Sequence, residues 1–108
     1  MGKKSKVYRM VNGQLLQMNK SYGDLKMKQK DKIANWCYQE YKAYVDRTGK
    51  LPDKFGDIDI VDAVYRRIES AQIWIPEYEI DEYYHSRKTR LQKRYEKENN
   101  IQNEIHST

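Results

Sequence analysis

Residues 31–48 read DKIANWCYQEYKAYVDRT, and this stretch decides the fold of the chain. Its apolar side chains recur at intervals of three and four residues, which is the spacing of one face of an α-helix. The members of this stripe are Ile33, Ala34, Cys37, Tyr41, Tyr44 and Val45, with Trp36 and Tyr38 beside it. The pattern predicts a helix that forms the spine of a small core, in which Cys37 is a buried and inert thiol.

The segment before this helix combines turn signals with positive charge. Ser21 or Asp24 can cap the helix, but lysines at positions 26, 28, 30 and 32 oppose the helix dipole in its first turns. We therefore expect residues 25–30 to be extended or frayed, and the firm helix to begin near Asp31.

Further upstream, the dipeptide Asn12-Gly13 separates two short runs, 7–11 and 14–18, that contain apolar residues. Asn-Gly favours the type I′ turn of a β-hairpin, because both residues tolerate positive φ angles. Two strands alone are only marginally stable in water, so the hairpin is expected to lie on the helices. A plain loop, or a tail that folds only on a partner, is the alternative. Residues 1–6 are expected to form a flexible basic arm.

After the first helix, Gly49 and the pair Leu51-Pro52 predict a stop. A second helix is expected to follow, capped by Asp57 or Asp59 and running to about Gln72. Its predicted inward residues are Ile58, Val61, Val64, Tyr65 and Ile68. Its predicted outward residues are Arg66, Arg67 and Glu69.

Pro76 suits the first position of a third helix, which is expected to run to about Glu98. Its inward side is marked by Ile80, Tyr84, Leu91 and Tyr95. Because the apolar stripe thins after His85, the second half of this helix is expected to project from the core. Residues 99–108 are expected to form a polar, disordered tail. The predicted fold is a mainly α, three-helix domain over residues 7–98, with an N-terminal β-hairpin and flexible termini.

Charge is divided along the chain into three blocks. Residues 1–50 carry twelve Lys and Arg against four Asp and Glu, residues 51–86 carry three against nine, and residues 87–108 carry six against three. The chain thus has a basic flank, an acidic middle and a basic end, and its net charge is +5. Such a distribution steers charged partners toward the molecule, although it does not name one.

The third helix carries the main candidate binding residues. Five of them fall at increments of four, three, four and three and therefore share one face: Tyr83, Arg87, Arg90, Arg94 and Lys97. Lys88 and Lys93 flank this face. A basic helical face with an aromatic residue at its head can follow a phosphate backbone and offer arginine to base edges. A simple solvated face is the alternative.

A second candidate is the N-terminal lysine cluster, which includes Lys26, Lys28 and Lys30. Scattered lysines lack the bidentate geometry of arginine, but they would add salt-dependent affinity for any polyanion. Solubility alone is the other explanation for this cluster.

Catalytic and metal-binding arrangements are poorly represented in the sequence. Asp81 and His85 are one helical turn apart, but two ligands do not make a metal site, and a local ion pair explains them better. The carboxylates at Glu77, Glu79, Asp81 and Glu82 suit the start of a helix. No glycine-rich phosphate loop is present. We therefore expect a non-enzymatic protein with no catalytic residues, no metal and no cofactor.

The expected location is cytoplasmic, with no membrane partner. The single cysteine rules out an intramolecular disulfide. No apolar run approaches the length of a membrane span, and no hydrophobic region follows the basic N-terminus as it would in a signal peptide.

The link Thr48-Gly49-Lys50-Leu51-Pro52 resembles the helix, Gly-x-x-Pro, short-helix segment of small DNA-associated repeats that accompany homing endonucleases. The resemblance covers about residues 38–70, and no site residue is carried over from it. Our leading hypothesis is a DNA-binding or other nucleic-acid-binding protein, or a nucleoprotein-associated accessory protein, of the kind that phages and mobile elements encode.

Two other hypotheses remain open. One is a protein-binding inhibitor of a host nuclease or defence complex, whose acidic segment 53–82 mimics nucleic acid. The other is a structural or oligomeric protein, such as a homodimer in which acidic and basic surfaces pair.

Overall fold

The computed structural model describes residues 8–11, 13–17 and 20–106 of the 108-residue chain. Its elements are β1 (Tyr8–Val11), β2 (Gln14–Gln17), the 3-10 turn η1 (Tyr22–Asp24), α1 (Met27–Thr48), α2 (Lys54–Ser70) and α3 (Glu77–His106). The predicted fold class, a mainly α three-helix domain with an N-terminal hairpin, is confirmed. The expected basic arm, residues 1–6, lies outside the described residues.

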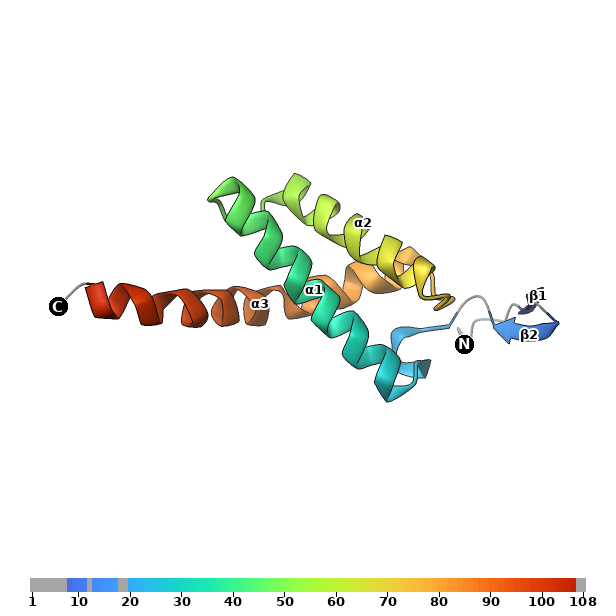
Figure 1. Cartoon of the computed structure of the whole chain (residues 1–108). Helices are drawn as coiled ribbons and strands as arrows, with labels where there is room; N and C mark the ends of the chain where they lie inside the picture. Colours follow the sequence, from blue (N-terminus) through green and yellow to red (C-terminus); the bar gives the residue numbers. More distant parts are fainter. Residues whose placement is uncertain (1–7, 12, 18–19, 107–108) are drawn as a thin grey trace.

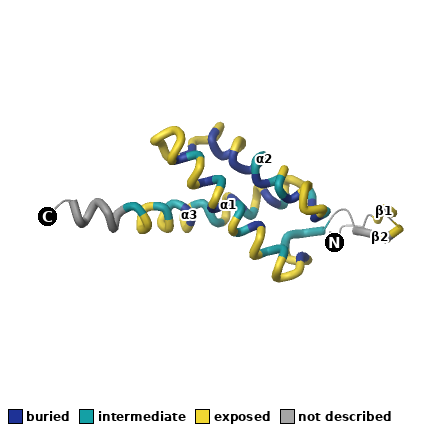
Figure 2. The backbone as a smooth tube through the Cα atoms, viewed as in Figure 1, coloured by how far each residue is buried: buried dark blue, intermediate teal, exposed yellow. Residues whose placement is uncertain are grey.

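The helices α1 and α2 lie side by side and antiparallel, and α3 crosses them (Figure 1). Buried residues gather where the three helices meet (Figure 2). The core contains Leu25, Ile33, Cys37, Tyr38, Tyr41, Val45, Ile60, Val61, Val64, Ile68, Ile73, Ile75, Ile80, Tyr84 and Leu91. The predicted spine is confirmed, since Ile33, Cys37 and Tyr41 are fully or almost fully buried.

The helix α1 begins earlier than expected, at Met27. Lys26 occupies the N-cap position. The backbone N–H of Lys26 donates a hydrogen bond to the side-chain oxygen of Gln29 at 3.1 Å. This bond satisfies a donor at the helix start and offsets the unfavourable lysines of the first turns. Ser21 and Asp24 instead close η1, where the Asp24 carboxylate accepts hydrogen bonds from the Ser21 N–H and hydroxyl.

The helix α2 also begins earlier than expected, because Asp53 caps it in place of Asp57 or Asp59. The Asp53 carboxylate accepts a hydrogen bond from the backbone N–H of Gly56 at 2.8 Å. An N-cap of this kind satisfies one of the unpaired donors at the helix start. The stretch 54–56 is therefore part of the first turn of the helix.

One predicted inward residue of α2 lies on the wrong side. Ile58 is exposed, whereas Ile60 is buried with Val61, Val64 and Ile68. The buried stripe continues back to positions 60 and 57, and residue 58 is turned about 100° from residue 57, toward the solvent.

The helix α3 runs to His106, past the end expected near Glu98. No Gly or Pro follows Pro76 in the sequence, so no strong helix breaker stops it. The second half of α3 extends beyond α1 and α2, as predicted (Figure 1). Within the described part of the chain, no helix has both the length and the apolar character needed to cross a membrane.

The strands β1 and β2 pair antiparallel around Gly13, whose φ angle of 78° lies in the left-handed region that favours glycine. The hairpin stands away from the helices instead of lying on them (Figure 1). The expectation that the helices cover it is therefore wrong. The three helices close their core without it, and its side chains Tyr8, Met10 and Leu15 remain exposed.

Cys37 supplies a test of the buried spine, because burial raises the pKa of its thiol to about 12. Only the thiolate reacts with alkylating reagents, so iodoacetamide at pH 9 should label the native protein at least about 100-fold more slowly than the urea-unfolded protein. The rates can be compared by mass spectrometry. Rapid labelling of the native protein would contradict a structural role for this thiol.

Gly56 supplies a test of the α1–α2 contact, since a Cβ atom there would lie 2.6 Å from Cζ and Oη of Tyr44. Gly56→Ala is expected to lower the free energy of unfolding by about 1 kcal/mol, because the Tyr44 ring must move. In a Tyr44→Ala background, the same change should instead raise the free energy of unfolding by about 0.5 kcal/mol, because alanine has a better helix propensity than glycine. Urea denaturation of the four proteins measures this coupling, and equal effects in both backgrounds would refute the contact.

Candidate nucleic-acid interface

An aromatic stack docks the turn η1 on α3. The rings of Tyr22 and Tyr83 lie 4.0 Å apart between their centroids, with an angle of 18° between their planes. The backbone N–H of Tyr22 donates a hydrogen bond to Oε1 of Glu79 at 2.8 Å. Burial, and then the hydrogen bond with Tyr83, raise the pKa of the Tyr22 hydroxyl. The stack therefore fixes the start of the helical domain against the third helix.

Two cations flank this stack. The Lys30 ammonium lies 5.8 Å from the centre of the Tyr22 ring, and the Arg87 guanidinium lies 5.5 Å from the centre of the Tyr83 ring. Both distances are within the range of cation–π attraction. Lys30 belongs to the N-terminal lysine cluster and Arg87 to the basic face of α3. The fold thus brings one member of each predicted cluster to the same place.

A second arginine of α3 also rests on a tyrosine ring. The Arg94 guanidinium lies 3.8 Å from the centre of the Tyr38 ring, and its Nε donates a hydrogen bond to Oε2 of Glu98 at 3.2 Å. The Tyr38 hydroxyl donates a hydrogen bond to the other oxygen of Glu98. Burial, and then this bond, raise the pKa of Tyr38 to about 12. The same bond, helped by Arg94, holds the pKa of Glu98 below its ordinary value.

The remaining predicted binding residues lie on the surface. Arg90, Lys93 and Lys97 are exposed on α3, and Lys26 and Lys28 are exposed at the start of α1. In the part of the chain that the structure describes, none of these five side chains forms an ion pair with a carboxylate. Their counterions can therefore be exchanged for the phosphates of a bound polyanion.

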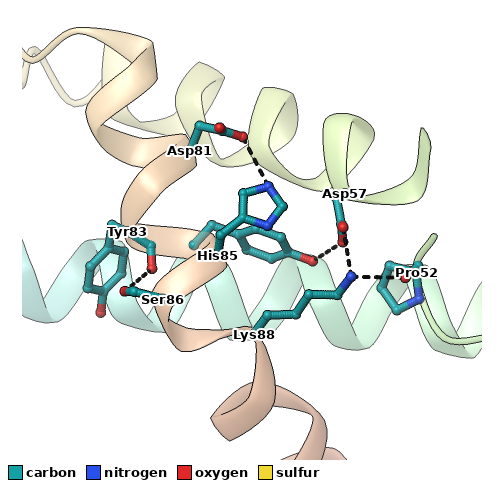
Figure 3. Close-up of polar contacts among 8 residues, drawn as sticks. Pro52, Asp57, Asp81, Tyr83, His85, Ser86 and Lys88 are labelled. Carbon is teal, nitrogen blue, oxygen red and sulfur yellow. Dashed lines mark hydrogen bonds and ion pairs between the residues drawn. The ribbon is translucent and has the colours of Figure 1, made fainter. Parts of the chain in front are cut away.

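Lys88, which flanks the basic face of α3, is partly buried and bonded within the molecule. Its ammonium donates hydrogen bonds to Oδ2 of Asp57 at 2.7 Å and to the carbonyl oxygen of Pro52 at 3.2 Å (Figure 3). The Tyr84 hydroxyl donates a hydrogen bond to Oδ1 of Asp57 at 2.7 Å. Asp57 is only 6 % exposed, so both of its oxygens need these donors. Lys88 is therefore the counter-ion of a buried carboxylate, in contrast to the other lysines of α3, which are unpaired among the described residues.

Sequence reasoning missed Asp57 and Tyr84 as a buried polar pair. From the sequence, Asp57 fits the role of a helix cap, and Tyr84 fits an ordinary position in the apolar stripe of the third helix. One signal was readable, because Asp57 stands four residues before Val61 and seven before Val64, on the inward face of α2. An acidic residue in that register needs a partner from another element.

The carboxylates of the acidic middle are divided among different tasks. Asp53 caps α2, Asp57 is buried, Asp62 forms an ion pair within α2, and Asp81 contacts His85 within α3. Four of the nine carboxylates are thus buried or have a partner within their own helix, whereas Asp59, Glu69, Glu77 and Glu82 are exposed.

The predicted local pair on α3 is present, with Asp81 Oδ1 and His85 Nε2 3.4 Å apart (Figure 3). Among the described residues, no group of three or more His, Cys, Asp or Glu side chains is placed to hold a metal ion. The pair therefore stays a two-residue contact at the surface.

Comparison with known proteins finds no matching family model, no matching curated protein and no matching solved structure. The function must therefore be argued from the arrangement of the side chains themselves.

The pair of Asp57 and Lys88 can be tested by mutation. Lys88→Met leaves the buried carboxylate with the Tyr84 hydroxyl as its remaining donor, and it should lower the free energy of unfolding by about 3 kcal/mol at pH 7. Adding Asp57→Asn removes the uncompensated charge and should restore part of that loss. Urea denaturation of both single variants and the double variant measures the coupling. Strictly additive effects would show that the two side chains do not interact.

Proposed function

We propose that this protein is a non-enzymatic accessory protein that binds nucleic acid, acting in the cytoplasm alone or within a nucleoprotein complex. Its binding surface would run along α3 from Tyr83 to Lys97 and include Lys30 of α1. The observation that carries the proposal is the stack of Tyr22 on Tyr83 with a cation beside each ring. This stack joins basic groups from two distant parts of the sequence into one surface.

Arginines held in place by aromatic rings would anchor the ligand. Arg87 and Arg94 are seven residues apart, which corresponds to about 10.5 Å along an α-helix. Each guanidinium lies over a tyrosine ring, and this support reduces the side-chain entropy that is lost when a phosphate is bound. Arg90 is exposed between them. The three arginines would contact successive phosphates along one strand or base edges in a groove.

The shape of the molecule supports the same function. The second half of α3 projects from the other helices, and its described residues are mostly exposed or partly exposed (Figure 2). A projecting helix can enter the major groove of DNA, which is wide enough to admit one α-helix. The positive charges at residues 87–97 would make the affinity depend steeply on salt.

The decisive variant replaces Arg87, Arg90 and Arg94 with Ala. The slope of log affinity against log salt concentration should flatten by about two to three, near one for each lost phosphate contact. Fluorescence anisotropy with labelled single- and double-stranded DNA and RNA at several salt concentrations measures this slope. Circular dichroism should show an intact fold, because none of the three arginines is in the core.

A matched control removes the same amount of charge from exposed positions on or before α2, by replacing Lys50, Lys54 and Arg66 with Ala. This control should keep the parental slope within about one unit. The proposal fails if the parent shows no salt-sensitive binding, or if the α3 triple variant binds as well as the parent.

A further inference from the structure

The hairpin carries an exposed apolar face. Met10 pairs directly with Leu15 across the two strands, and Tyr8 lies two residues from Met10, so the three side chains share one face. All three are exposed. A two-stranded hairpin is marginally stable by itself in water, and it gains stability when a packed surface covers one face.

A second uncovered apolar patch lies at the start of α2. Phe55 and Ile58 are one helical turn apart, and Leu51 precedes them in the connection from α1; all three are exposed. Phe55 is the only phenylalanine of the chain, and it lies outside the core. Contiguous exposed apolar side chains of this size are typical of interaction sites.

The two patches differ in charge. The hairpin segment is basic, since residues 1–23 contain five Lys and Arg and no Asp or Glu. Both signs surround the α2 patch, where Asp53, Asp59 and Asp62 lie together with Lys50, Lys54 and Arg66, and Arg66 pairs with Asp62. The apolar character that the two faces share is therefore what makes them complementary.

We propose that a second copy of this chain covers both patches, in a symmetric dimer in which each hairpin docks on the start of α2 of the partner. The exchange is reciprocal, so it closes with twofold symmetry and leaves no patch free for further growth. This inference does not rest on the proposed nucleic-acid binding, because the patches lie outside the basic face of α3.

The available area is sufficient for such a dimer. The six apolar side chains of the two patches are between 49 % and 74 % exposed. At about 200 Å² for a fully exposed large side chain, they offer on the order of 700 Å² in each copy. A standard stable interface buries about 800 Å² on each partner, so the six side chains supply most of it.

The hairpin of the same molecule is poorly placed to cover its own α2 patch. The two lie at opposite ends of the α1–α2 pair (Figure 1). Tyr22 holds the chain after the hairpin near Lys30, whereas the start of α2 meets α1 at Tyr44. Those two positions on α1 are fourteen residues apart, which corresponds to about 21 Å. A second copy meets no such restriction.

Sedimentation equilibrium of the full chain over a range of concentrations tests the dimer. The parent should dimerise, and both Met10→Glu and Phe55→Glu should shift the protein to the monomer, with a loss of at least about 10-fold in the association constant. Met27→Glu, which changes another exposed apolar side chain, should leave the dimer intact and serves as the control. Helical circular dichroism should be unchanged in all three variants, and salt-dependent nucleic-acid binding should be unchanged in Phe55→Glu, which lies away from the basic face.

Mixing the two variants tests which surfaces meet. In a reciprocal exchange, a heterodimer of Met10→Glu and Phe55→Glu keeps one intact contact, formed by the parental hairpin of one chain and the parental α2 patch of the other. Native mass spectrometry of the mixture should therefore show heterodimers in excess of either homodimer. The proposal is overturned if the parent is monomeric throughout, if Phe55→Glu remains fully dimeric, or if the mixture forms no heterodimer.

Discussion

The packing of α2 on α3 depends on the neutralisation of one buried carboxylate. Asp57 carries a negative charge into the core, where an unpaired carboxylate would cost more than the surrounding apolar contacts provide. The Tyr84 hydroxyl and the Lys88 ammonium, both on α3, are its two donors. Lys88 also holds the carbonyl of Pro52, directly before α2. These bonds are directional, so the start of α2 is fixed against α3 more tightly than apolar packing alone would fix it.

The tyrosines of this small core both pack against it and hold polar and basic side chains in place. The chain has ten tyrosines and one phenylalanine, and several tyrosines at the edge of the core place the ring inward and the hydroxyl on a polar group. Tyr38 bonds Glu98, and the Tyr95 hydroxyl donates a hydrogen bond to Asp46 at 2.6 Å. The faces of Tyr38 and Tyr83 carry arginines. The rings that complete the core therefore also orient the basic side chains, which couples the stability of α1 on α3 to the proposed binding surface.

The molecule has a packed centre and two extensions. The three helices form the centre, the hairpin extends from one end, and the second half of α3 extends from the other (Figure 1). The overall dimensions of 60 × 31 × 23 Å reflect this arrangement. The core does not need the hairpin, whose apolar face is exposed, whereas the second half of α3 contacts α1 through Tyr95 and Glu98 and keeps basic side chains at the surface. Nucleic-acid binding and self-association would then occupy different parts of the chain.

The helices and strands can be identified from the sequence, because their signals are local. The periodicity of residues 31–48 identifies α1, Gly49 marks its end, and Asn12-Gly13 identifies the hairpin. The helix starts differ by a few residues from the predicted ones. Lys26 and Asp53 occupy the N-cap positions, for which the sequence also offered other polar residues. Only the tertiary structure decided that Lys88 meets Asp57 and that Lys30 and Arg87 share one aromatic stack. Those contacts join residues far apart in the sequence, and no local pattern fixes the angle at which the helices cross.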